Sequence, residues 1–282
     1  MSRIRQVVIA TRDIRKAQET AGKMLETFPV YTDPELAHFG LENVIMPLGH
    51  SFLEFITPLE DKGKDNNTVC RFLGDSHASA GYMVLVQVPN PDAIKQARQT
   101  AVDLGLRIVH EGSRAPGEKG RFDWDESGPG LCTPGVAGFH LHHEDVGCVC
   151  EISVSNPRAH WEWAGSEWRG GLVRTKIAHS STQGIAGVTI ATEDPSKVAE
   201  NWIALLALDR DNRVHESPDG SSVVLVLDDE SELELRKPKH PSEKGLVGIR
   251  VLSSSSKLER LKDPRIGNVT ISMDPIVPRS KL

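Results

Sequence analysis

Short runs of alternating or β-branched apolar residues recur along the chain, separated by segments with helical periodicity. Residues 4–11 form a β-branched run of strand length. Asp13 then stands at a helix N-cap position, and apolar residues three or four positions apart give the next segment one apolar helical face. Residues 43–48 and 52–57 form two further strands. The pattern predicts a strand, a helix and then more strands.

The same order of elements returns in the second half of the chain. Ile190-Ala191-Thr192 matches Ile9-Ala10-Thr11, and Asp194 matches Asp13 at the start of the next helix. The strands that follow place Glu234 where Glu54 stands in the first copy. An internal repeat of this kind determines the architecture and is weighed before any single motif.

Two more units complete the pattern. The second unit predicts a strand at 82–88, a helix at 91–104, a strand at 106–110 and a hairpin at 139–154. A fourth, shorter unit runs from Leu246 to Met273. The fold class is therefore α+β, with four tandem strand-helix-strand units paired as one with two and three with four.

The pairing sets the domain boundaries. Residues 1–160 form an N-terminal domain of two units, which carries the candidate site. Residues 161–180 form a connector that contains tryptophans. Residues 181–282 form a C-terminal domain whose second unit is shortened.

Composition describes an ordinary soluble protein and narrows the partners. The chain has 282 residues, of which 38% are hydrophobic and 26% charged, and a net charge of -6 without a basic run argues against nucleic acid. No apolar run reaches the roughly 18 residues that a membrane span needs, and no signal-peptide core follows Met1. Four cysteines, two of them as Cys148-x-Cys150, favour a reducing compartment. We expect a small-molecule substrate, neither nucleic acid nor membrane as partner, and a possible homodimer.

The stretch from Gly138 to Glu151 is the richest in chemistry. His140, His142 and His143 lie in it together with Glu151. Neutral imidazole is the commonest metal ligand among side chains, and a carboxylate supplies a hard oxygen beside it. On one strand, His140 and His142 would share a face. The alternative is a hairpin with polar residues on its solvated side.

The last three residues, Ser280-Lys281-Leu282, match the tripeptide that the peroxisomal import receptor reads. In a eukaryotic chain this would predict a peroxisomal location. In a bacterial chain the tripeptide carries no such meaning, and the location would be cytoplasmic.

The repeated βαβββ order, with a glutamate on the last strand of a unit, resembles the vicinal oxygen chelate superfamily. More narrowly, the chain is similar to glyoxalase-like domains of that superfamily, which also includes the bleomycin-resistance proteins. The stretches that carry this likeness are His38–Asn43, Phe52–Glu54, Gly81–Val84, His140–Gly147 and Trp161–Gly165. The resemblance implies four βαβββ modules paired into two such domains.

The resemblance also implies a divalent metal ion, for example zinc, manganese, iron or nickel. The matching ligand positions hold Gln6, Glu54 and Glu151, all acceptable for such an ion. At the fourth position stands Met83, whose thioether is a poor ligand. His140 or His142 would replace it, unless the site is lost.

The C-terminal pair lacks the ligand set. Gly187 holds the place of Gln6, and near the end of the fourth unit only Asp274 is available. Extradiol dioxygenases carry two histidines in the C-terminal pair, so iron-dependent ring cleavage is not expected. We predict a structural role for residues 181–282.

Two functions follow from the resemblance. The first is a metal-dependent enzyme that moves a proton on a small carbonyl or acyl substrate, as an isomerase, epimerase, lyase or hydrolase, with Glu54 or Glu151 as catalytic base. The second is a binding protein of the same fold that holds an apolar or aromatic ligand without metal. Further residues expected at the substrate pocket are His38, Asn43, Tyr82, Met83 and Trp163.

Overall fold

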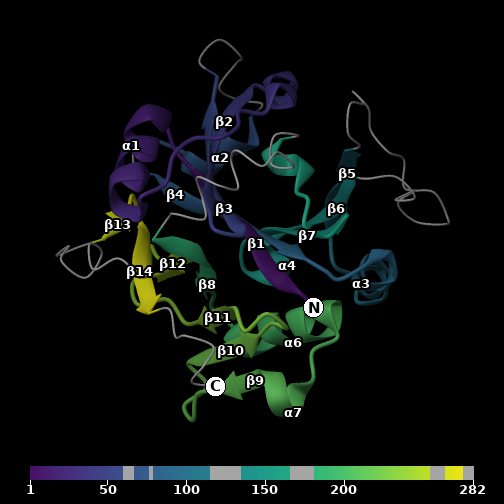
Figure 1. The fold of residues 1–282 in the computed structure, drawn as a ribbon. Coiled ribbons are helices and arrows are strands. Elements are labelled where there is room, and N and C mark those ends of the chain that lie inside the picture. The colour runs from purple at the N-terminus through teal and green to yellow at the C-terminus, as the bar shows by residue number, and fades with distance from the viewer. Residues whose placement is uncertain (60–66, 76–78, 115–134, 166–180, 255–263, 276–282) are drawn as a thin grey trace.

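The structure, a computed structural model, describes residues 1–59, 67–75, 79–114, 135–165, 181–254 and 264–275. Strands dominate it and join into one branched, curved 14-stranded sheet, with helices set against it (Figure 1). The α+β class predicted from the sequence is confirmed. A short 3-10 helix, η2 (Glu162–Ala164), lies between the two halves of the chain.

The N-terminal half holds the first two units. Its strands are β1 (Arg3–Ala10), β2 (Leu41–Leu48), β3 (Ser51–Pro58), β4 (Ala80–Gln87), β5 (Ile108–Arg114), β6 (Gly135–Leu141) and β7 (Val149–Asn156). Its helices are α1 (Ile14–Leu25), α2 (Thr68–Leu73), α3 (Pro91–Asp103) and α4 (His143–Val146), with a 3-10 helix η1 (Pro34–Phe39).

The C-terminal half holds the third and fourth units. Its strands are β8 (Thr182–Ala191), β9 (Val214–Glu216), β10 (Ser222–Val226), β11 (Glu232–Arg236), β12 (Gly245–Ser253), β13 (Arg265–Ile266) and β14 (Val269–Pro275). Its helices are α6 (Pro195–Leu206) and α7 (Arg210–Arg213).

Strand pairing reproduces the repeat. β1 runs parallel to β3 and antiparallel to β4, and β8 is likewise parallel to β11 and antiparallel to β12. Glu54 pairs with Val8 in the first half as Glu234 pairs with Thr189 in the second. The predicted equivalence of these glutamates, and of Gln6 with Gly187, is therefore confirmed by register.

The predicted helix starts are confirmed as well. The side chains of Asp13 and Asp194 each accept a hydrogen bond of 3.0 Å from a backbone N–H of the first turn, which satisfies one free helix donor. The helices α2, α4 and η1 were not predicted. Each has six residues or fewer, too short for an apolar periodicity to show.

The two faces of the N-terminal sheet pack into different apolar clusters. Alternate residues of β1 separate cleanly, because Val7 and Ile9 join one cluster while Val8 and Ala10 join the other. We call the first the core face, since α1, α3 and the C-terminal half cover it. We call the second the site face; it carries Gln6 and is covered by η2 and α2.

Two irregularities in the β1–β4 ladder add side chains to the site face. The register passes from Ile4 to Gln6 and skips Arg5, and it passes from Met83 to Gly81 and skips Tyr82. An extra residue in one strand turns its side chain out of the normal alternation. Tyr82 therefore packs in the same cluster as its neighbour Met83.

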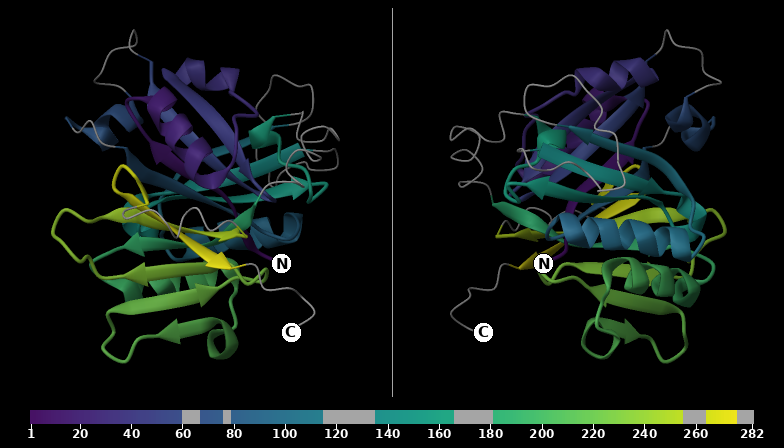
Figure 2. Two further views of the ribbon diagram at one scale, coloured as in Figure 1. Left: turned by 60° about the vertical axis from the view of Figure 1, so that its left-hand side comes forward. Right: turned by 90° about the vertical axis from the view of Figure 1, so that its right-hand side faces the viewer.

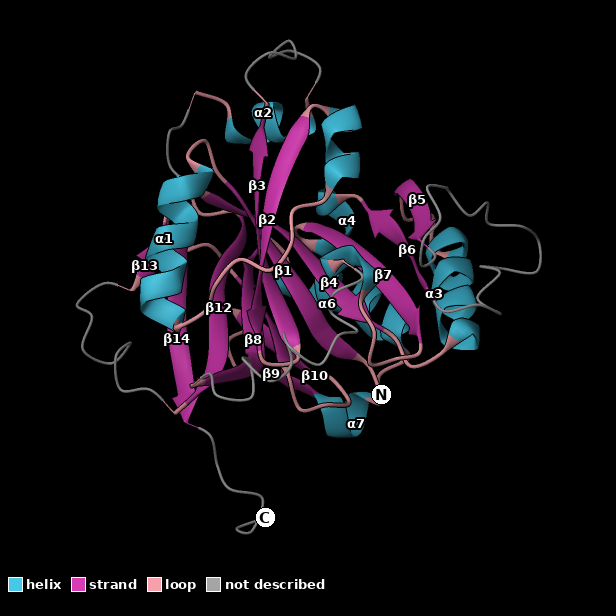
Figure 3. Ribbon diagram, turned by 45° about the horizontal axis from the view of Figure 1, so that its top comes forward, coloured by secondary structure: helices cyan, strands magenta, loops and turns pink. Residues whose placement is uncertain are grey.

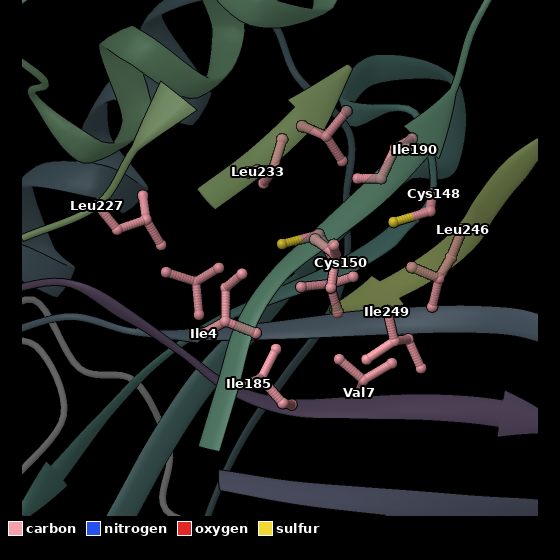
Figure 4. Close-up of a cluster of buried hydrophobic side chains, with 14 of the residues drawn as sticks. Ile4, Val7, Cys148, Cys150, Ile185, Ile190, Leu227, Leu233, Leu246 and Ile249 are labelled. Atoms are coloured by element: carbon pink, nitrogen blue, oxygen red, sulfur yellow. The ribbon is translucent and has the colours of Figure 1, made fainter. Parts of the chain in front are cut away.

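One apolar cluster joins the two halves. Ile4 and Val7 of β1 lie near Ile185 of β8 and Ile249 of β12 (Figure 4). At one edge of this junction α3 packs against α6, as Figure 2 shows in its right-hand view. Trp202 of α6 is fully buried and donates its indole N–H to the carbonyl oxygen of Val146, at 3.0 Å.

No helix among the described residues is long and apolar enough to cross a membrane. Several sequence predictions fall outside the described ranges: most of the 161–180 connector, including Trp168, and the Ser280-Lys281-Leu282 tripeptide. The peroxisomal location and the import receptor therefore stay predictions.

Gly49 lies where the N-terminal half contacts the backbone of the C-terminal half. It has a φ of +59°, and a Cβ there would lie 1.9 Å from the backbone oxygen of Gln183 in β8. Gly220 has a φ of +65°, but an added Cβ there would meet no atom within 4 Å. Gly220→Ala therefore introduces backbone strain without a steric clash. We expect Gly49→Ala to lose about 1–3 kcal/mol more free energy of unfolding than Gly220→Ala in urea denaturation. Equal losses would contradict this close contact.

Candidate active site

Glutamate 54 lies on the site face because strand alternation places it there. It is the central residue of β3, between neighbours Leu53 and Phe55 that point into the core face. Across the ladders lie Val8 of β1 and Ile45 of β2, both in the site-face cluster. Figure 3 shows these strands side by side. The carboxylate therefore sits among apolar side chains.

Two side-chain amides hold the Glu54 carboxylate. Gln6 donates from Nε2 to Oε2, and Asn43 donates from Nδ2 to Oε1, each at 2.6 Å. Both of these contacts are buried. Glu54 thus accepts a hydrogen bond on each oxygen, from two strands on either side of its own.

The orientation of each amide is fixed in turn. Gln6 Oε1 accepts a hydrogen bond of 2.6 Å from the indole N–H of Trp161, and Asn43 Oδ1 accepts one of 2.7 Å from the backbone N–H of Asp33. Each amide can therefore present only its NH2 group to Glu54. The side chain between these two NH2 groups must therefore offer two acceptor atoms. A carboxylate has two, whereas a carboxamide has one.

Burial dominates the electrostatics of Glu54. Only 8% of the residue is exposed, and the loss of hydration raises the pKa of its carboxyl group to about 7. The hydrogen bonds from Asn43 and Gln6 oppose this rise, whereas the charges of Asp33 and Glu151 add to it. A carboxyl group with such a pKa both binds and releases a proton near neutral pH.

The second carboxylate, Glu151, lies on β7 and is also buried. Its Oε1 accepts hydrogen bonds from Ser153 and, at 2.8 Å, from the indole N–H of Trp163. Its Oε2 lies 2.7 Å from His140 Nε2. The β6–β7 register pairs His140 directly with Glu151, which brings together two of the predicted residues.

Gly138 on β6 makes room for Glu151. A Cβ at position 138 would lie 2.5 Å from Oε1 of Glu151 and 2.9 Å from its Cγ and Cδ. The carboxylate therefore rests on the bare backbone of the neighbouring strand. No backbone strain is involved, because the φ of Gly138 is not in the positive range.

His142 lies one residue beyond the strand that carries His140, so the predicted strand is one residue too long. β6 ends at Leu141, and His142 becomes the N-cap of α4, where its Nδ1 accepts a hydrogen bond of 3.3 Å from the backbone N–H of Glu144. The centroid of its ring lies 4.3 Å from the centroid of the His143 ring. The contacts of His142 are with Glu144 and His143, whereas His140 contacts Glu151.

Of the other five residues predicted at the substrate pocket, four lie at the site face and one does not. Asn43 and Trp163 contact the two carboxylates directly, and Tyr82 and Met83 belong to the same apolar cluster. The ring of Tyr82 meets that of Phe72 edge-on, with centroids 5.0 Å apart. His38 lies on η1 with an exposed side chain, 3.6 Å from Glu35, and is not brought to the site.

The residues do not fit a divalent ion in this arrangement. Among the described residues, no group of three or more His, Cys, Asp or Glu side chains is placed to hold a metal. Each candidate oxygen already shares a lone pair with a donor of the protein: Gln6 Oε1 with Trp161, both Glu54 oxygens with side-chain amides, and Glu151 Oε1 with Trp163. Met83 adds only a thioether.

Sequence reasoning did not identify three contributors to the site. Trp161 stands in the connector and in a stretch that carries the resemblance, but no pattern links it to Gln6, which its fully buried ring orients. Gly138 and Ser153 had no signal of their own, since their importance comes from the position of Glu151. Strand alternation from Glu151 to Ser153 was the available clue for the serine.

No family model matches the sequence, and no curated protein matches it. Among solved structures, a hypothetical protein from Staphylococcus aureus aligns with 98% of this chain and 100% of its own, with a TM-score of 0.61 and 9% identity. This likeness shows the fold alone.

Methylmalonyl-CoA epimerases also appear among the structural matches. The enzyme from Mycobacterium tuberculosis aligns with 54% of this chain and 87% of its own, with a TM-score of 0.38 and 17% identity. An epimerase in complex with methylmalonyl-CoA and NH4+ aligns with 56% of this chain and 97% of its own, with a TM-score of 0.41 and 16% identity. These matches span about half of the chain, and at these TM-scores they carry no argument about it.

Gly138→Ala should displace the Glu151 carboxylate. Because Glu151 is held by several hydrogen bonds, we expect the substitution to break at least one of them and to lower the free energy of unfolding by about 1–3 kcal/mol. The same change combined with Glu151→Ala, which removes the obstructing atoms, should cost much less than the sum of the two single changes. Urea denaturation of the four proteins measures this coupling, and strict additivity would contradict the contact.

The buried carboxyl group of Glu54 should make stability depend on pH. Because its pKa rises from 4.5 in an ordinary glutamate to about 7 here, the folded protein binds this proton more tightly than the unfolded chain does. The stabilisation from this group is complete below about pH 4.5 and is lost as pH rises through about 7. At about 1.4 kcal/mol for each tenfold change in proton affinity, the loss is about 3 kcal/mol.

Glu54→Gln isolates this contribution, because glutamine does not titrate. The difference in free energy of unfolding between wild type and Glu54→Gln should shift by about 3 kcal/mol against the wild type between pH 4.5 and pH 7.5. Urea titrations across this range measure it. A constant difference would show that Glu54 titrates as an exposed glutamate does.

Proposed function

We propose that the site face catalyses proton transfer at a carbon beside the carbonyl group of a small carbonyl or acyl compound. The observation that carries this proposal is the pair of buried carboxylates, Glu54 and Glu151, on one apolar face. Strands β1 and β4 lie between β3 and β7, so the two carboxylates stand on either side of this central strand pair. A substrate carbon between them would have a proton acceptor on each side.

The chemistry needs only side chains of this chain. One carboxylate removes the proton, and the C–H electron pair moves toward the carbonyl oxygen to form an enol or enolate. A proton then returns to the same carbon from the same or the opposite carboxylate. Glu54 suits the first role, because burial holds the pKa of its carboxyl group at about 7.

Epimerisation or isomerisation is the version that this arrangement supports best. Both reactions require a proton to leave and return, with no net addition of water. Glu151, held by His140 and Trp163, is the group for the opposite side. The apolar surroundings strengthen interactions with developing charge, since few water dipoles compete there.

An alternative function is the binding of an apolar or aromatic ligand without chemistry. Tyr82, Met83 and Trp163 favour it, since all three belong to the apolar cluster of the site face. In that case the wild-type protein and Glu54→Gln would bind aromatic probes with the same affinity, and neither would exchange a substrate proton. Fluorescence titration of both proteins distinguishes this function from the first.

Proton exchange in deuterium oxide tests the proposed reaction without knowledge of the natural substrate. A panel of single enantiomers, including 2-methyl acyl thioesters and 2-hydroxy ketones, would be incubated with the protein and followed by NMR. We expect deuterium to enter at the carbon next to the carbonyl for at least one class. Glu54→Gln should slow this exchange by at least a hundredfold.

Two further variants make the test specific. Glu151→Gln should keep exchange on one face and lose inversion of configuration, because only one of two acceptors is removed. Glu234→Gln changes the equivalent glutamate of the C-terminal half, whose carboxylate accepts from Thr189 at 2.7 Å, and should leave the rate unchanged. If Glu54→Gln exchanges as fast as Glu234→Gln for every active class, the proposed role of Glu54 is wrong.

A further inference from the structure

The start of the connector returns across the site face and places two indole rings on it. Trp161 is fully buried and Trp163 is partly buried, and both pack in the site-face cluster. The guanidinium group of Arg5 lies over the ring of Trp161, with its carbon 5.5 Å from the ring centroid, and donates a hydrogen bond of 3.0 Å to the carbonyl oxygen of Ala159. Trp161 is therefore held firmly in place.

The indole N–H of Trp161 decides which atom of Gln6 faces Glu54. A metal ion at this place would need the amide oxygen of Gln6, but that oxygen accepts from Trp161 at 2.6 Å. Turning the amide by 180° would set its NH2 against the indole N–H and remove a donor from Glu54. Each buried group left without a partner would cost about 1–3 kcal/mol.

The indole N–H of Trp163 acts in the same way on Glu151. It donates to Oε1 at 2.8 Å, while Oε2 lies against His140. A cation that approached Oε1 would have to compete with this partly buried donor for the oxygen. The two rings, two residues apart in one short segment, thus engage two of the positions that the resemblance assigns to metal ligands.

We infer that Trp161 and Trp163 are positioning residues whose indole N–H groups hold Gln6 and Glu151 in a hydrogen-bonded arrangement that excludes a divalent cation from the site face. In this arrangement the connector fixes the two carboxylates without a metal ion. Trp163 bonds to Glu151 directly, and Trp161 acts on Glu54 through Gln6. The catalytic consequence of this arrangement rests on the proposed function, but the exclusion of cations does not. Cation binding can therefore be tested whether or not the exchange reaction is found.

Calorimetric titration with Zn²⁺, Mn²⁺ and Ni²⁺ tests the inference directly. We expect no cation binding by the wild-type protein that depends on Glu54 or Glu151. Any weak binding should therefore be the same in Glu54→Gln and Glu151→Gln. Binding of one cation per chain by wild type, lost in either variant, would overturn the inference. The result is independent of any enzymatic activity.

A designed gain of binding provides the second measurement. Met83→His supplies an imidazole at the position where the resemblance expects a ligand, and the double change Trp161→Phe with Trp163→Phe removes both indole donors while keeping aromatic rings. We expect the triple variant to bind one cation at least tenfold more tightly than Met83→His alone. Equal affinities would show that the indole groups do not exclude the ion.

Trp202→Phe is the matched control. Trp202 is also fully buried and also donates its indole N–H, to the carbonyl oxygen of Val146, but it lies in the C-terminal half. Added to Met83→His, it should leave cation affinity unchanged at a similar cost in stability. An equal gain from Trp202→Phe would mean that loosened packing, and not loss of the donors, admits the ion. Circular dichroism confirms that each variant is folded.

Discussion

The orientation of two buried side-chain amides is the constraint on which the rest of the site depends. Gln6 and Asn43 can each turn only one way, because an indole N–H and a backbone N–H already engage their oxygens. What lies between them must accept hydrogen bonds on both sides. A carboxylate in an apolar cluster then follows as the only charged group that fits, and its proton affinity follows from its burial.

This constraint draws on parts of the sequence that are far apart. Trp161 stands in the connector, Gln6 on the first strand and Asn43 on the second. Trp161 bonds to Gln6, and both Gln6 and Asn43 bond to Glu54. The same strands use their other face to pack against helices and the C-terminal half. Period-two alternation lets one strand serve both surfaces, and the irregularities at Arg5 and Tyr82 move two large side chains from one surface to the other.

Much of the architecture was predictable because it is encoded locally. The aspartate caps and the repeated strand patterns were enough to place Glu54 on a strand of the first unit and to make it equivalent to Glu234. The partners of Glu54 were not predictable in this way, since the contact between Trp161 and Gln6 spans 155 positions and leaves no local pattern. The strand before His142 was predicted one residue too long, because a four-residue helix begins directly after that histidine. The need for glycine at position 138 arises from a side chain on the next strand, which no pattern within β6 records.

The apolar cluster shared by the two halves has a consequence for natural variation. Ile185 and Leu233 belong to the C-terminal half, yet they pack with Ile4 and Val7 of the strand that carries Gln6. A destabilising substitution at either position would lower the amount of folded protein in a cell. The activity of each folded molecule would stay the same. Under the proposed function, alleles at these two positions would therefore change the amount of folded protein, and alleles at Glu54 would change the reaction.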